Sequence, residues 1–166
     1  MSNLAGVLLV FALMFSHASD AGEYRQIIKD EGVVYEVYRG PKGFLHAGVG
    51  HRLPDNCVCE VGDEVSKKTV ARWFWADYEE ASLTAYKFAP NAPATVHAIL
   101  TNMAFNLGQP RLFSFKRLRK AIEEERWFEA AYEMQESLWF DDVGPRSKRL
   151  VNRMLSYGRS QRTEPE

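Results

Sequence analysis

Two periodicities divide the chain into a short part with strand character and a longer helical part. Between residues 33 and 61 the apolar and polar side chains alternate with a period of about two, and beyond that apolar side chains recur every three or four residues. Ahead of the alternating part, residues 19–32 predict a helix, in which Asp20 and Glu23 resemble a capping box and Gly32 is a natural end. The pattern therefore predicts one helix, a small sheet and a helical remainder.

The alternating part predicts three short strands. Residues 33–39 are rich in β-branched and aromatic side chains, and residues 44–50 alternate as a second strand, with the turn sequence GPKG at 40–43 between them. A second turn at 53–56 separates these from residues 57–61 (CVCEV), which predict a third strand.

The helical part predicts five further helices, and the first of them is long. Their expected ranges are 65–88, 94–108, 113–125, 126–137 and 144–157. Strands gathered near the N-terminus and helices gathered after them indicate an α+β fold with a small sheet lobe and a larger helical lobe. A cleft between the two lobes is the natural place for a ligand.

The first 21 residues follow a different pattern. Residues 4–15 are uncharged and mostly apolar, and the small residues after them suit cleavage by signal peptidase. This run is short for a span of the bilayer. We interpret residues 1–21 as an export signal and residues 22–166 as the mature domain, destined for the periplasm or the medium. No Lys or Arg precedes the apolar run, so a membrane anchor that is released later and a buried N-terminal helix stay open as alternatives.

The composition indicates a globular domain, and the charge balance argues against a nucleic-acid partner. Of 166 residues, 46% are hydrophobic and 13% aromatic, which is typical of a globular domain. The 21 basic and 22 acidic residues nearly balance, with a formal net charge of −1, so nothing indicates nucleic acid as a partner. We expect a monomer, with a transient membrane contact through the N-terminal apolar run as the one addition.

The two cysteines, Cys57 and Cys59, are too few for a disulfide scaffold or a zinc site. A bridge between residues only two apart is expected to be strained. The sequence therefore favours packed or loosely oxidised thiols on the strand predicted over 57–61, and no metal site is expected.

One acid interrupts an apolar face. Tyr24, Ile27, Ile28 and Glu31 share one face of the first helix, so Glu31 takes a place in the last turn where an apolar side chain is expected. Partial desolvation helps a carboxyl keep the proton that a general acid must donate. An ordinary ion pair, for instance with an Arg near the C-terminus, is an equally good interpretation of the pattern.

Asp77 and two histidines complete the set of candidates. Asp77 falls on the apolar stripe of helix 65–88 and needs a partner, and His51 at the end of the second strand is a plausible one; we interpret this pair as structural. His46 alternates with Gly48 on the second strand, where glycine lets a ligand approach the backbone. Its proximity to Glu31 makes a functional role for His46 as plausible as a structural one.

These residues carry a resemblance to a known family. Glu31-Gly32, a hairpin and then GVGH at 48–51 form a pattern that resembles the phage-type lysozymes. The resemblance covers nearly all of residues 22–160 and continues in order through NMAFNLG (102–108), RWFEAA (126–131), SLWF (137–140) and PRSKR (145–149).

The resemblance implies a fold in which a long helix joins a small sheet lobe to a helical lobe. It also implies a bacteriolytic muramidase of the endolysin kind, which cleaves the β-1,4 bond between N-acetylmuramic acid and N-acetylglucosamine in bacterial peptidoglycan without a cofactor. Glu31 matches the general acid and Arg146 an arginine that pairs with it. Phe105 and Asn106 match positions that face the saccharide cleft. The pair of His51 and Asp77 matches a structural pair of the family.

The chain departs from the family where the second acid belongs. That position, nine residues after Glu31, is Gly40, and the family's Thr six residues further on is His46. No Asp or Glu occurs between residues 37 and 54. Three hypotheses follow. In a hydrolase, which we favour, His46 holds or deprotonates the water or attacks the sugar itself. In a lytic transglycosylase, Glu31 acts alone. In the third, the domain binds peptidoglycan as a non-catalytic virion component.

Overall fold

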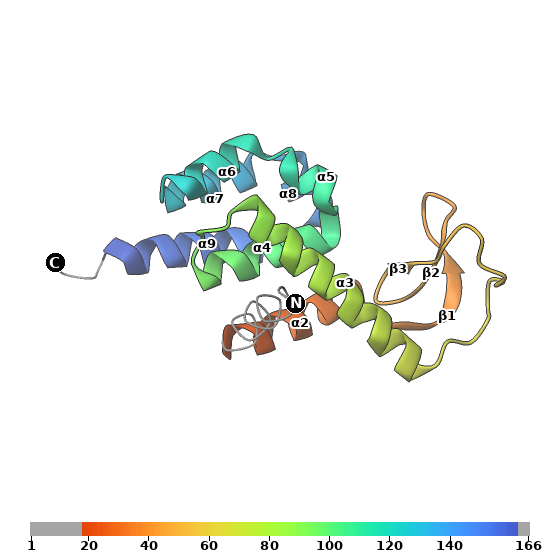
Figure 1. Ribbon diagram of the computed structural model, residues 1–166. Helices are drawn as coiled ribbons and strands as arrows, with labels where there is room; N and C mark the ends of the chain where they lie inside the picture. The colour runs from red at the N-terminus through yellow and green to blue at the C-terminus, as the bar shows by residue number, and fades with distance from the viewer. Residues whose placement is uncertain (1–17, 163–166) are drawn as a thin grey trace, which may run out of the picture.

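The computed structural model describes residues 18–162 and has an α+β fold, as the sequence predicts. Figure 1 shows a small sheet at one end of the long helix α3 and a group of helices around its other end. The strands are β1 (Val34–Arg39), β2 (Leu45–Gly48) and β3 (His51–Arg52). The helices are α2 (Ala18–Glu31), α3 (Lys67–Phe88), α4 (Ala94–Leu107), α5 (Gln109–Phe113), α6 (Lys116–Glu123), α7 (Trp127–Gln135), α8 (Leu138–Val143) and α9 (Pro145–Arg162).

The sheet is antiparallel, in the order β1-β2-β3. Its third strand is not at 57–61, where the alternation placed it, and that prediction is wrong. Gly48 and Gly50 both have a positive φ, so the chain reverses directly after β2 and His51–Arg52 pair with it at once. The loop that follows returns along the free edge of β1, where the amide of Val37 donates to the carbonyl of Asp63 at 2.9 Å.

The two cysteines lie in that loop rather than on a strand. Cys57 and Cys59 form a disulfide with their Cα atoms 5.4 Å apart. Of the two states expected, packed thiols are wrong and oxidised thiols agree with the structure, and the expected position on a strand is wrong. The bond closes a ring around Val58, whose side chain is fully exposed. The disulfide therefore shapes an exposed loop and takes no part in the core.

Helix α3 contributes to two hydrophobic cores. Ser66 caps its N-terminus by accepting a hydrogen bond from the Thr69 amide, and its first half buries Val70 and Phe74 against Ile27 and Val49. Its second half buries Ala81, Ala85 and Phe88 in the larger core of the helical lobe. A single helix with side chains in both cores fixes the sheet lobe relative to the helical lobe.

Helix α4 lies at the centre of the helical lobe and buries side chains on most of its surface, as its nearly continuous apolar sequence predicts. The sequence pattern did not predict α5 and α8, because helices of five and six residues are too short to show a helical repeat. Among residues 18–162, no helix is long and apolar enough to cross a membrane. The apolar run of the predicted export signal, residues 4–15, lies outside the described residues.

Candidate active site

Glu31 is the last residue of α2, at the point where Gly32, with φ +75°, turns the chain toward the sheet. Its side chain is 23% exposed, and its Oε1 accepts a hydrogen bond from Arg146 on α9 at 2.8 Å. A Cβ added to Gly50, in the turn after β2, would lie 3.7 Å from Oε2. The ion pair expected from the sequence is thus present, and beside the second carboxylate oxygen lies a glycine, which has no side chain to fill the adjacent space.

Helix α9 holds α2 through a row of arginines. Arg146 also lies 3.4 Å from Asp30, and Arg149 contacts the same carboxylate at 2.5 Å. Arg146 is almost fully buried, with 8% of its side chain exposed. Its contacts therefore position Glu31, as the family resemblance implies for Arg146. The spacing of three residues between the two arginines places them on one face of α9, which is a signal that the sequence carried.

Glu23 takes part in the same contact between α2 and α9, and sequence reasoning missed it. The side chain is 2% exposed; Oε2 lies 2.5 Å from Arg153, and Oε1 accepts a hydrogen bond from Asn102 at 2.7 Å. Because α2 begins at Ala18, Glu23 lies in its interior, and the expected capping role is wrong. Its place four residues before Ile27, on the buried face of the helix, was the available signal.

His46 lies on β2 opposite Tyr38 of β1. Its Nδ1 is 3.0 Å from the carbonyl oxygen of Phe44. A carbonyl only accepts, so Nδ1 carries the proton and Nε2 of a neutral imidazole has the free lone pair. The geometry therefore leaves His46 able to take up a proton at Nε2.

Tyr38 contacts one of the two candidate catalytic side chains, His46. Its ring stacks on the imidazole of His46 with the centroids 5.7 Å apart and the planes 25° apart. Burial of the phenol raises the pKa of Tyr38, and the negative charge of Glu31 raises it further. Tyr38 therefore contacts His46 directly and is subject to the charge of Glu31.

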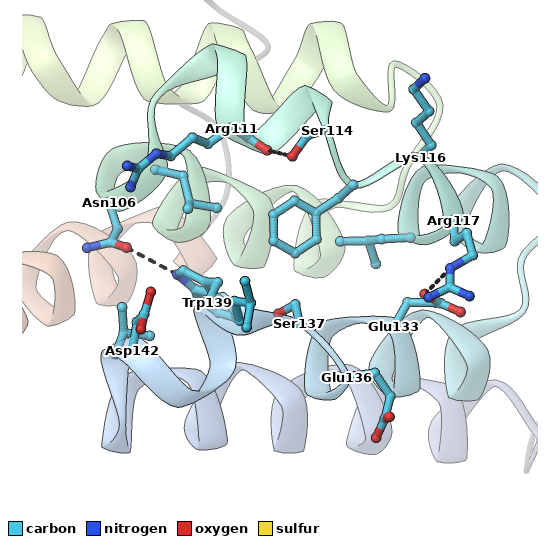
Figure 2. A pocket seen from close by; sticks show the side chains of 15 residues that line it. Asn106, Arg111, Ser114, Lys116, Arg117, Glu133, Glu136, Ser137, Trp139 and Asp142 are labelled. Atoms are coloured by element: carbon cyan, nitrogen blue, oxygen red, sulfur yellow. Dashed lines mark hydrogen bonds and ion pairs between the residues drawn. The ribbon is translucent and has the colours of Figure 1, made fainter.

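Phe105 and Asn106 lie on the last turn of α4. Phe105 packs on Phe74 of α3 at 5.8 Å between ring centroids and contacts both hydrophobic cores. Asn106 accepts a hydrogen bond from the indole of Trp139 at 3.1 Å, as Figure 2 shows, and this fixes the direction of its amide. It lines a hollow of about 750 Å³ between α5, α6, α7 and α8. Asn106 thus borders a hollow of the helical lobe, whose lining includes neither Glu31 nor His46.

Gly48 packs β2 against α3. It is buried, and a Cβ added to it would lie 3.2 Å from Cγ1 of Val70 on α3. Its φ of +67° also requires glycine. These contacts favour a role in packing β2 against α3 over the ligand contact expected for Gly48.

His51 and Asp77 connect the sheet to α3. Nδ1 of His51 lies 2.8 Å from Oδ2 and 3.1 Å from Oδ1 of Asp77, and the imidazole stacks on Trp73 at 4.8 Å. Both side chains are partly exposed, so Asp77 is less buried than its place on the apolar stripe suggested. The pair joins β3 to the middle of α3, and the two side chains take each other as partners, which suits the structural role expected for them.

The site offers no obvious place for a metal. Within residues 18–162, no group of three or more His, Cys, Asp and Glu side chains is arranged to hold a metal ion.

Comparison with known proteins agrees with this arrangement. Residues 28–156 match the family model for phage lysozyme. The chain is 28% identical over 148 residues to a protein named probable T4-type lysozyme 2 of Dictyostelium discoideum, a match that covers 74% of this chain and 87% of the relative. It is 25% identical over 138 residues to a peptidoglycan hydrolase, gp36, of Pseudomonas phage phiKMV, covering 80% of this chain and 15% of that longer protein. The chain therefore belongs to the phage lysozyme family.

Proposed function

We propose that this protein is a muramidase that cleaves the β-1,4 bond between N-acetylmuramic acid and N-acetylglucosamine in peptidoglycan, with Glu31 as the general acid. The observation that carries the proposal is the setting of Glu31, which Arg146 holds through one carboxylate oxygen while Gly50 leaves space beside the other. Membership of the phage lysozyme family and the names of the relatives support a peptidoglycan-degrading enzyme.

In this scheme the protonated carboxyl of Glu31 gives its proton to the glycosidic oxygen as the bond to the anomeric carbon breaks. A water molecule adds to that carbon, and Nε2 of His46 takes the proton that the water loses. Glu31 ends as a carboxylate and His46 as an imidazolium, and exchange with solvent restores both. His46 would thus replace the water-activating pair of the family, whose acid is missing at Gly40.

A lytic transglycosylase is the second candidate, favoured by the absence of any Asp or Glu between residues 37 and 54. In that reaction the C6 hydroxyl of the muramic acid attacks, and Glu31 alone acts as acid and then as base. A non-catalytic peptidoglycan-binding domain is the third candidate. It is disfavoured because such a domain would gain nothing from a partly exposed carboxylate held by a buried arginine.

The cellular setting is part of the proposal. Residues 1–21 would export the chain, or anchor it until it is released, and the mature monomer would act on the bacterial wall during host lysis. Sequencing the N-terminus of the protein recovered from the periplasm and from membranes tests this. A chain that stays in the cytoplasm would contradict it.

Glu31→Gln tests the assignment of the acid. We expect the variant to lose lysis of cell walls, measured as clearing of a wall suspension, while it keeps the thermal midpoint of the wild type. Glu79→Gln, at an exposed position of α3, is the matched control and should clear the suspension like the wild type. Wild-type clearing by Glu31→Gln would remove Glu31 from its role.

A further inference from the structure

Gly40 stands at the position where the family's second acid is missing. The space beside it is filled by a side chain from the opposite strand of the hairpin, that of His46. Gly40 is buried at the end of β1, and a Cβ built on it would lie 2.7 Å from both Cε1 and Nδ1 of His46. The next nearest atom is the carbonyl oxygen of Phe44 at 3.6 Å. The imidazole of His46 therefore takes the space that any side chain at position 40 would need.

The backbone does not require glycine at this position. Gly40 is absent from the residues with positive φ, which include Gly43 in the same turn. A larger residue would be compatible with the backbone conformation, but it would have to displace the imidazole of His46. Glycine at position 40 is thus explained by the neighbouring imidazole.

Two further contacts fix that imidazole. The Phe44 carbonyl accepts from the Gly40 amide at 2.9 Å and lies 3.0 Å from Nδ1 of His46, so one acceptor fixes both the turn and the ring. Tyr38 stacks on the ring at 5.7 Å. Because Tyr38 and Gly40 are two residues apart on one chain, they belong to the same side of the hairpin as the His46 ring.

We infer that Gly40 and Tyr38 are positioning residues, which hold the imidazole of His46 as its Nδ1–H tautomer and leave Nε2 as the base of the hydrolytic reaction. This inference rests on the proposed function. Relative to the family, glycine at position 40 removes the second carboxylate. The same glycine leaves the space that the imidazole of His46 fills.

Gly40→Ala tests the inference in the full-length chain. The methyl group must displace the imidazole, which is the free end of a side chain and can swing away, so the thermal midpoint should stay close to the wild-type value. We expect kcat on peptidoglycan to fall by roughly 10²-fold with little change in KM, because a displaced general base loses its contribution. Gly22→Ala, whose Cβ would meet nothing within 4 Å, is the control and should behave as the wild type.

A double variant shows whether Gly40 acts through His46. If it does, Gly40→Ala added to His46→Ala should cause no further loss, since the group that it displaces is already gone. Nitrogen NMR of the His46 ring gives a readout that does not depend on activity. We expect Nδ1 to be protonated in the wild type and in Tyr38→Phe. The signals should change in Gly40→Ala, because the displaced ring loses its contact with the Phe44 carbonyl, and in Tyr38→Leu, because no aromatic ring then stacks on His46.

The outcomes separate the inference from the proposed function. Loss of activity in His46→Ala but not in Gly40→Ala, with unchanged ring signals, would overturn the inference and leave the role of His46 intact. Wild-type activity in His46→Ala would overturn the hydrolytic role of His46, and the inference with it. Activity in Glu31→Gln would overturn the proposed function itself.

Discussion

Arg146, near the start of the last helix, donates a hydrogen bond at 2.8 Å to the carboxylate of Glu31, 115 residues earlier in the chain. The guanidinium is buried and also contacts Asp30, so two carboxylates of α2 share one cation. The candidate acid is therefore complete only when the C-terminal helix has packed against the N-terminal one.

Replacing this arginine should affect stability as well as catalysis. Arg146→Ala leaves two partly buried carboxylates without their shared partner, and we expect the free energy of unfolding to fall by about 3 kcal/mol in urea titrations. Arg146→Lys keeps the charge but cannot reach both carboxylates with one planar group, and should recover only part of the loss. Equal stability of Arg146→Ala and wild type would show that the ion pair contributes nothing.

The buried Glu23 gives a second prediction. Arg153→Met leaves the Glu23 carboxylate buried without its cation, and we expect a loss of about 2 kcal/mol in the free energy of unfolding. Adding Glu23→Gln removes the charge and keeps an acceptor for Asn102, so the double variant should be more stable than Arg153→Met. Arg159→Met, at an exposed position of the same helix, is the control. A double variant less stable than the single one would contradict the account.

His51 and Asp77 should be energetically coupled. Both are partly exposed, so we expect a coupling of only about 1 kcal/mol when His51→Ala, Asp77→Ala and the double variant are compared by thermal unfolding. The cleavage products should keep the same chemical form in all three variants, because His51 and Asp77 take each other as partners and neither is bonded to Glu31 or His46. Simple additivity of the two losses would mean that the contact is not a pair, and a changed product would give Asp77 a part in the reaction.

Tyr38 predicts a pH dependence of stability. Its pKa is raised above 10.0 in the folded state, first by burial and then by Glu31. Above about pH 10 the unfolded chain releases the phenol proton more readily than the folded one, so the free energy of unfolding falls as the pH rises through the folded-state pKa. Below about pH 10 this contribution is fully present.

Urea unfolding between about pH 7 and about pH 11 measures this effect. The wild type should lose more stability at the alkaline end than Tyr38→Phe, which has no proton to release. Tyr132→Phe, at an exposed position, should follow the wild type. Parallel curves for the wild type and Tyr38→Phe would contradict the origin of the shift.

The sequence predicted those parts of the fold that local chemistry determines. The turn at 40–43, the stop at Gly32 and the helical repeat of α3 gave the first hairpin and the long helix, within a few residues. The third strand was misplaced because CVCEV alternates well, whereas His51–Arg52 is too short to show a period. The pairing of β3 depends on the turn that Gly48 and Gly50 form, and a periodicity search does not detect it.

The sequence identified most residues of the candidate site, but it did not predict several of the contacts between them. Glu31 was recognisable as an acid on an apolar face, and the structure pairs it with Arg146 as the family resemblance implied. Glu23 was missed because a polar residue early in a helix is usually a capping group. The contact between Gly40 and His46 depends on the register of two strands and could not be deduced from either residue alone.

The products of peptidoglycan digestion in oxygen-18 water test the central claim most directly, with the full-length chain beside Glu31→Gln and a mass spectrum of the muropeptides. The account predicts reducing ends that carry the label and no cleavage by Glu31→Gln. Unlabelled 1,6-anhydro ends, lighter by one water, would contradict the role of His46 and identify a transglycosylase that uses Glu31 alone. No cleavage by the wild type would contradict the enzymatic account as a whole.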